Sequence, residues 1–174
     1  MPIHAMIMCF AALFSFVSIF IPMFEVFVQY QHQRTYSLLS MLINPKIYTK
    51  LMSGNEVQLD FLGFGVLMFV ITIVIAVAAV TLSFSYQLFV DNSKKKRIGC
   101  IVVMILFIAR LAAHVFTMSG FITDSMMKSN NMTPERLYVA QTFMGNAMVL
   151  ILFIGAVASL YGALGLKMNF KLFA

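Results

Sequence analysis

Apolar residues are gathered into four long runs along the chain, and more polar segments separate these runs. The runs cover residues 5–28, 61–90, 98–122 and 137–166. Each exceeds the roughly 20 residues that a helix needs to cross the hydrocarbon core of a bilayer. Because none has a polar face that water could solvate, the pattern predicts four transmembrane helices rather than the amphipathic helices of a soluble protein.

The second run argues against a β-barrel. Its segment Phe69–Val80 reads FVITIVIAVAAV and is apolar at nearly every position. A barrel strand alternates apolar and polar residues with a period of two. An isolated strand would also leave its backbone without hydrogen-bond partners in lipid, so a helix is favoured.

The segments between the runs differ in length and character. The first, residues 29–60, contains the apolar stretch Tyr36–Leu42 and then the helix-breaking pair Asn44-Pro45. We expect a short amphipathic helix on the outer membrane surface here, or alternatively an ordered loop folded over the helix ends. In the segment 123–136, Thr133-Pro134-Glu135 is typical of a helix start.

Composition supports the membrane assignment. Of the 174 residues, 61% are hydrophobic and 10% are charged, whereas soluble domains are about half apolar and a quarter charged. So few charges cannot cover the surface of a soluble enzyme of this length. The composition also excludes a disordered tail and a fibrous repeat, and it leaves an integral membrane protein.

The positions of the charges predict an orientation. The net charge is +6, and its densest cluster is the tetrabasic run Lys94, Lys95, Lys96 and Arg97 in the predicted loop 91–97. Because basic loops stay on the cytoplasmic side, we expect both termini inside. As a topology signal the run needs no further role; the alternative is that it also binds anionic lipid headgroups. The basic residues are spread over loops and tails, so nucleic acid is not an expected partner.

The expected fold is therefore an all-α membrane protein. Residues 1–174 form one antiparallel four-helix transmembrane bundle with both termini inside and a short interfacial helix in the first outer loop.

Two ionisable residues lie deep in the third run. Arg110 and His114 are four residues apart and share one helix face. Because an unpaired charge is costly in a membrane, such residues suggest a function by default. Glu25, Gln141 and Asn146 fall at similar depth in the other predicted spans. We expect these five residues to form a polar cluster in the outer half of the bundle.

Three interpretations of that cluster stay open. It forms an ion or proton path or a headgroup site, or it is a structural clasp between helices. In the third interpretation Arg110 pairs with an acid on another subunit. Interhelical polar contacts contribute only about 0.6–2 kcal/mol in membranes, which is enough for a clasp.

Small residues in the fourth run predict a close helix contact. Gly155 and Ser159 are four residues apart, and Gly162 continues the row. Such spacing lets helix backbones approach each other. The pattern leaves open whether the partner helix is internal or belongs to another chain.

The two cysteines, Cys9 and Cys100, are too few for a disulfide scaffold or for a metal site built on sulfur ligands. Cys100 follows the basic run closely, so it is either a packed thiol or a palmitoylation site.

Motifs of known chemistry are missing from the sequence. It contains no paired carboxylates, no Ser-His-acid grouping, no glycine-rich phosphate loop and no H-E-x-x-H. The chain resembles claudins, tetraspanins and connexins only in the outline of four spans. It lacks the loop cysteines of all three families and the tryptophans of the claudin loop, so no residue role is carried over. We expect no catalysis, no cofactor and no metal.

The expected function is that of a non-catalytic structural, assembly or accessory subunit of a larger membrane complex. Its partners would be the bilayer and other membrane subunits or copies of itself. The alternative is a small homo-oligomeric ion channel or transporter built around Arg110 and His114. The expected location is the plasma membrane or an organellar inner membrane.

Overall fold

A computed structural model describes residues 2–28, 31–50, 56–88, 93–118 and 137–165. The described chain is mostly helical, and three of its helices are long and apolar enough to cross a membrane. These membrane-length segments are Leu62–Tyr86, Lys94–Val115 and Phe143–Leu164. A multi-pass membrane protein is consistent with these three segments.

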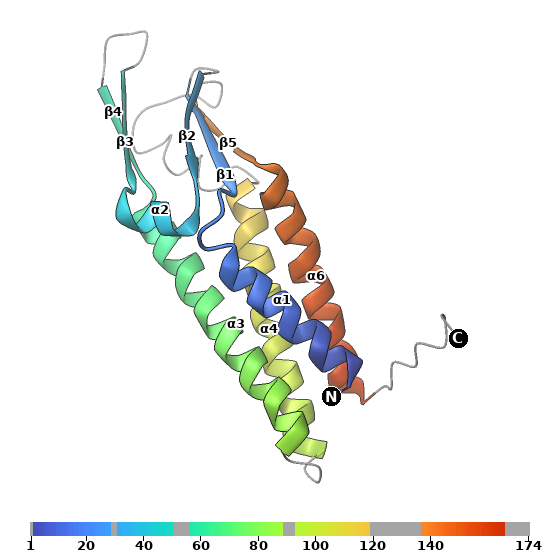
Figure 1. The fold of residues 1–174 in the computed structure, drawn as a ribbon. Coiled ribbons are helices and arrows are strands. Elements are labelled where there is room, and N and C mark those ends of the chain that lie inside the picture. The colour runs from blue at the N-terminus through green and yellow to red at the C-terminus, as the bar shows by residue number, and fades with distance from the viewer. Residues whose placement is uncertain (1, 29–30, 51–55, 89–92, 119–136, 166–174) are drawn as a thin grey trace. The chain divides into compact units, whose positions relative to one another are not determined.

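The elements follow one another along the chain as labelled in Figure 1. In order they are α1 (Ile3–Val17), β1 (Phe24–Val28), β2 (Gln31–Tyr36), α2 (Leu38–Ile43), β3 (Lys46–Lys50), β4 (Glu56–Asp60), α3 (Leu62–Leu88), α4 (Ser93–Met118), β5 (Leu137–Gln141) and α6 (Phe143–Leu164).

The contacts divide the chain into two compact units. The first takes its described residues from Met1–Phe16, Ile71–Leu111 and Leu150–Ala174, and the second from Val17–Val70 and Ala112–Val149. Helices α3, α4 and α6 each contribute residues to both units.

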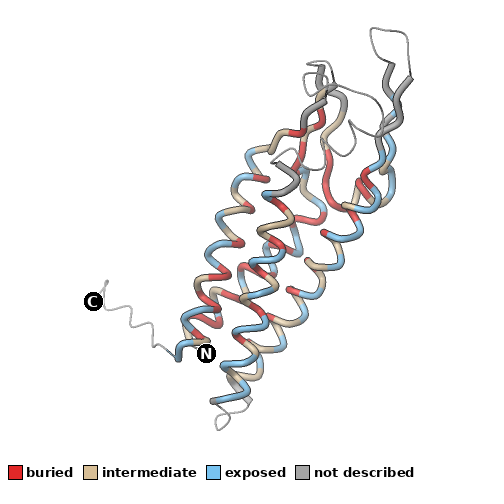
Figure 2. Tube along the Cα trace, turned by 180° about the vertical axis from the view of Figure 1, so that it is seen from behind, coloured by how far each residue is buried: buried red, intermediate tan, exposed pale blue. Residues whose placement is uncertain are grey.

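The first unit is a helical bundle with an apolar core. In α1 the buried positions recur at helical spacing, at Ala5, Met8 and Ala12. They belong to one side of the helix, and Figure 2 shows buried positions recurring along the helices. Phe107 of α4 and Leu152 of α6 are also completely buried. The other sides carry large apolar side chains, as expected of helices surrounded by lipid.

The second unit contains two small antiparallel sheets. The strand order is β2-β1-β5 in one sheet and β3-β4 in the other (Figure 1). Alternation in β1 explains the first sheet: Phe24 and Val26 are buried, whereas Glu25 between them is half-buried. A bulge between Val26 and Phe27 shifts the register of β1 against β2.

The short helix expected in the first loop is present as α2. Ser37 is its N-cap and forms a capping box with Ser40: the Ser40 N–H donates to Ser37 Oγ at 3.1 Å, and the Ser37 N–H donates to Ser40 Oγ at 2.8 Å. Such boxes satisfy backbone donors that the first turn leaves open. The helix ends at Ile43 with Asn44 as its C-cap, so it stops at the predicted pair Asn44-Pro45.

The first predicted span differs most from the structure. Helix α1 ends at Val17, whereas the run was expected to stay helical to residue 28. Turn and bend residues follow, and β1 begins at Phe24. Pro22 has no N–H for a helical hydrogen bond, and the period-two alternation after it suits a strand. The prediction of helix over residues 18–28 was therefore wrong.

The boundaries of the later spans also shift. The second span is confirmed closely by α3, which begins and ends within two residues of the prediction. Helix α4 begins at Ser93, so the tetrabasic run expected in a loop is helical, in keeping with the good helix propensity of Lys and Arg. Leu137–Gln141 is the strand β5, and the fourth helix begins only at Phe143. The predicted helix start at Thr133–Glu135 lies outside the described residues.

Candidate functional site

Arg110 is completely buried in the first unit. Its Nε donates a hydrogen bond of 2.9 Å to Oγ1 of Thr72, which is also fully buried. The bond joins α4 to α3. A buried cation needs polar partners because an apolar surrounding cannot replace its hydration. The Arg110–Thr72 bond is thus the polar contact between helices that a clasp requires.

His114 is completely buried in the second unit. Its Nε2 lies 3.1 Å from the carbonyl oxygen of Gly145 on α6, and its ring centre lies 4.9 Å from that of Phe24 on β1. If Nε2 carries the proton, it donates to this carbonyl. A Cβ added at Gly145 would lie 2.4 Å from the carbonyl oxygen of Met23, so a larger residue does not fit there.

The other members of the predicted polar cluster are placed differently from expectation. Glu25 lies on β1 and pairs in register with Thr35 and Ala140, so its expected position on a helix was wrong. Gln141 is the last residue of β5 rather than part of a helix. Asn146 does lie on α6, but its side chain is exposed. His114 contacts the neighbours of Glu25 and Asn146 along the chain, Phe24 and Gly145.

The small residues of α6 pack inside the first unit. A Cβ at Gly155 would lie 2.7 Å from the Phe107 ring and 3.0 Å from Cβ of Ala11. Ser159 is buried, and its hydroxyl donates to the Gly155 carbonyl at 2.8 Å. At Gly162 the neighbours are Cys100 and His4. Gly155 and Gly162 therefore lie against other helices of the same chain, whereas the Ser159 hydroxyl bonds within α6.

The tetrabasic run begins α4. Lys94, Lys95 and Arg97 are exposed, whereas Lys96 is half-buried with its Nζ 5.1 Å from the ring centre of Tyr86. A Cβ at Gly165 would lie 2.8 Å from a terminal nitrogen of Arg97. This guanidinium therefore stands at the C-terminal end of α6, where a cation is stabilised by the helix dipole.

The first unit also contains a cluster of His4, Tyr86 and Cys100 that was not predicted from the sequence. Tyr86 Oη lies 3.2 Å from Cys100 Sγ, and the His4 ring meets the Tyr86 ring edge-on at a centre distance of 5.3 Å. The sequence contains a clue to this cluster, because His4, Tyr86 and Cys100 all fall near the predicted inner ends of their spans. Cys100 is fully buried, so the chain covers the thiol that palmitoylation would need.

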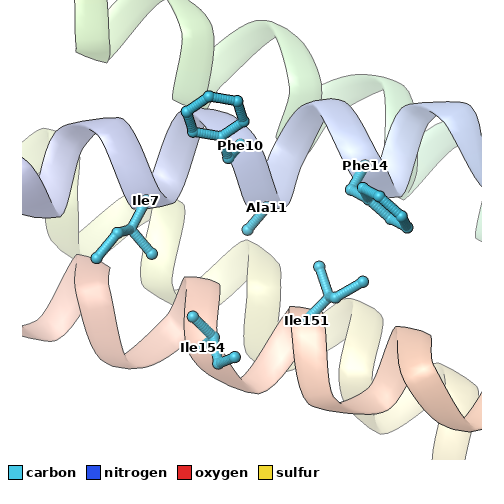
Figure 3. A pocket seen from close by; sticks show the side chains of 6 residues that line it. All are labelled: Ile7, Phe10, Ala11, Phe14, Ile151 and Ile154. Atoms are coloured by element: carbon cyan, nitrogen blue, oxygen red, sulfur yellow. The ribbon is translucent and has the colours of Figure 1, made fainter.

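A groove opens between α1 and α6. It is lined by Ile7, Phe10, Ala11 and Phe14 of α1 and by Ile151 and Ile154 of α6, and Figure 3 shows Ile7, Ala11 and Phe14 extending toward α6. Its volume is about 310 Å³, and its walls are almost wholly apolar. It suits an acyl chain or a neighbouring apolar side chain, and it offers no group for chemistry.

Tyr36 has an unusual setting in the second unit. Its side chain is fully buried, with its ring 5.4 Å from that of Phe61 and the Arg34 guanidinium 5.4 Å from its ring centre. Burial raises the pKa of Tyr36 because the phenolate would lose its hydration, while the Arg34 charge opposes this rise.

Within the part of the chain that the structure describes, no group of three His, Cys, Asp or Glu side chains is placed to hold a metal ion. Comparisons with protein-family models, with curated proteins and with solved structures give no match to this chain.

Proposed function

We propose that the protein is a four-span, non-catalytic membrane subunit that contributes helix faces to a larger membrane complex. In this proposal α1 is the fourth span, both termini are cytoplasmic, and the sheets lie outside. The membrane is the plasma membrane or an organellar inner membrane.

The length of the apolar segment supports the crossing by α1. Its 15 residues extend about 22 Å at 1.5 Å per residue. The residues from Ser18 to Met23 are mostly apolar and continue the segment. Because bilayers thin locally around short helices at modest cost, a helix of this length is compatible with a span.

The main observation behind the proposal is that buried polar side chains form their hydrogen bonds inside the helical bundle of the first unit. Three buried side chains of the first unit hydrogen-bond within it: Arg110 to Thr72, Ser83 to the Ala5 carbonyl at 3.0 Å, and Ser159 to the Gly155 carbonyl. Many exposed positions on the same helices are large and apolar; among them are Phe10, Val77, Ile105, Ile108, Phe153 and Leu160. This division suits helices that contact lipid and other helices, and not the lining of an aqueous pore.

The tetrabasic run supports the orientation. Its exposed lysines sit at the start of α4, beside a membrane-length segment, where cytoplasmic basic residues are usually found. Anionic lipid headgroups would add about 1 kcal/mol per charge near the surface.

Site-specific photocrosslinking tests the proposal. A photoreactive residue replaces Phe153, which is 56% exposed on α6, and in a matched control it replaces Leu152, which is fully buried on the same helix. After irradiation in the native membrane, the Phe153 position should give discrete crosslinks to other membrane proteins in stoichiometric amount. The Leu152 position should give none.

A homo-oligomeric channel is the competing outcome. Crosslinks between identical chains alone, together with ion flux in liposomes that is lost in Arg110→Ala and His114→Ala, would overturn the subunit proposal. Native mass measurement in mild detergent provides the subunit count for both cases.

A further inference from the structure

Four helices of the first unit bring His4, Tyr86, Cys100 and Gly162 together. His4 comes from α1, Tyr86 from α3, Cys100 from α4 and Gly162 from α6. A Cβ built at Gly162 would lie 2.6 Å from Cys100 Sγ, 3.0 Å from His4 Cδ2 and 3.2 Å from His4 Nε2. The thiol sulfur and the imidazole nitrogen therefore both lie against Gly162, beside the point that a side chain at this position would occupy.

The imidazole has an open coordination position. His4 is 8% exposed, and its Nε2 is buried without a hydrogen-bond partner among the residues that the structure describes. Leaving a buried polar atom unsatisfied is unfavourable, because the atom loses its hydration without gaining a bond. No hydrogen bond from the described residues satisfies Nε2. A ligand placed between Nε2 and Sγ would do so.

We propose that His4 Nε2 and Cys100 Sγ bind one Cu(I) ion. Soft thiolate ligands favour Cu(I), and imidazole is a common copper ligand. Metal–sulfur and metal–imidazole bonds are about 2.0–2.3 Å long, and both atoms lie within 3.2 Å of the point that a Gly162 Cβ would take. Tyr86 Oη, 3.2 Å from the sulfur, donates to the thiolate and orients it.

Charge and coordination number both select Cu(I) over Zn²⁺. One thiolate and one Cu(I) form a neutral unit, which an apolar helix bundle accommodates more readily than a net charge. Zn²⁺ in structural sites takes four ligands, and the described residues offer no third His, Cys, Asp or Glu beside these two. On binding, the Cys100 thiol proton leaves to water and copper keeps its oxidation state. The ion links α1 to α4.

A competition assay tests the site in the full-length protein, purified in mild detergent under reducing conditions. Cu(I) is offered together with a coloured Cu(I) chelator, and the metal lost from the chelator gives stoichiometry and affinity. Wild-type protein should take one Cu(I) per chain. The variants Cys100→Ser and His4→Phe should each bind at least tenfold more weakly, and the phenyl ring of the second preserves the contact with Tyr86.

The second cysteine supplies the matched control. Cys9 lies on α1, as His4 does, but it is not part of this cluster. The variant Cys9→Ser should therefore bind Cu(I) like the wild type. Cu(I) should also raise the thermal unfolding midpoint of wild type and Cys9→Ser, because it binds only the folded chain. It should leave the midpoint of Cys100→Ser and His4→Phe unchanged.

X-ray absorption at the copper edge should show one sulfur and one nitrogen neighbour. Failure of wild-type protein to compete for Cu(I) would overturn the proposal. So would full binding by either cluster variant, or loss of binding in Cys9→Ser. If Cys100→Ser does not fold, His4→Phe and the absorption spectrum decide the question without it.

Discussion

Arg110 illustrates how a membrane helix accommodates a charge. Nothing in the sequence near it neutralises the guanidinium, and the choice between a conducting and a clasping role was open. The structure places it against Thr72. No sequence pattern singles out this residue, because a single threonine in an apolar helix has no periodicity. Partners on other helices depend on packing and rotation, which periodicity alone does not define.

Thr72→Val tests the clasp. The change keeps the shape of the side chain and removes the oxygen that accepts from Arg110 Nε. We expect the free energy of unfolding in detergent to fall by about 0.6–2 kcal/mol, the range of interhelical polar contacts. Thr81→Val, at an exposed position of the same helix, is the matched control and should be nearly neutral. Equal effects of the two substitutions would contradict the clasp.

Tyr36 gives a prediction for pH dependence. Burial raises its pKa in the folded state, while the unfolded chain releases the phenolic proton near pH ~10. Above that pH the unfolded state holds fewer protons, so the stability that is present below it declines as pH rises.

The variant Tyr36→Phe isolates this contribution. Stability of wild type should fall more steeply above pH ~10 than that of Tyr36→Phe, and the two slopes should agree below it. Unfolding free energies measured on both sides of this pH provide the comparison. Parallel curves throughout would show that Tyr36 does not titrate abnormally.

At the scale of elements, long helices were predictable and strands were not. Helix α3 has no polar interruption, so hydropathy located it within two residues. Strands β1 and β5 are continuous with apolar runs, and their period-two alternation was hidden by the helix-length pattern around them. Pro22 and Thr142 mark these boundaries: Thr142 Oγ1 accepts from the Gly145 N–H at 3.1 Å and so caps the start of α6. The predicted positions of Glu25 and Gln141 in the polar cluster were wrong for the same reason, because both residues lie on strands that were expected to be helical.

Gly155 tests the close contact of α6 with its neighbours. In Gly155→Ala the new Cβ would overlap the Phe107 ring, so either the ring or the helix must move. Overpacking of this kind typically costs about 1–3 kcal/mol. The loss should appear as a lower unfolding free energy in detergent.

The control for this contact is the same substitution in α3. Around Gly63 a Cβ would meet no heavy atom within 4 Å, so Gly63→Ala should be neutral or stabilising by up to about 1 kcal/mol. Destabilisation by Gly63→Ala that matches or exceeds that of Gly155→Ala would show that loss of glycine, and not crowding, sets the effect.

At the scale of the whole molecule, three helices are long and apolar enough to cross a membrane, and the topology depends on whether α1 crosses it as well. Four spans place both termini on one side; three spans place them on opposite sides. The pattern of apolar runs predicted the membrane and the approximate positions of the spans. It did not predict the sheets: the pairing of β1 with β5 joins residues far apart in sequence, and β2, β3 and β4 lie in a segment that was expected to form a loop with one short helix.

Cysteine labelling with a membrane-impermeant maleimide tests the four-span arrangement most directly. Single cysteines replace Pro2, Tyr48 and Lys94 in a Cys9→Ser background, where Cys100 is buried. The account predicts that Tyr48→Cys reacts on intact cells, and that Pro2→Cys and Lys94→Cys react only after the membrane is opened. Labelling of Pro2→Cys and Tyr48→Cys from the same side would show that α1 does not cross the membrane and would contradict the four-span protein proposed for this chain.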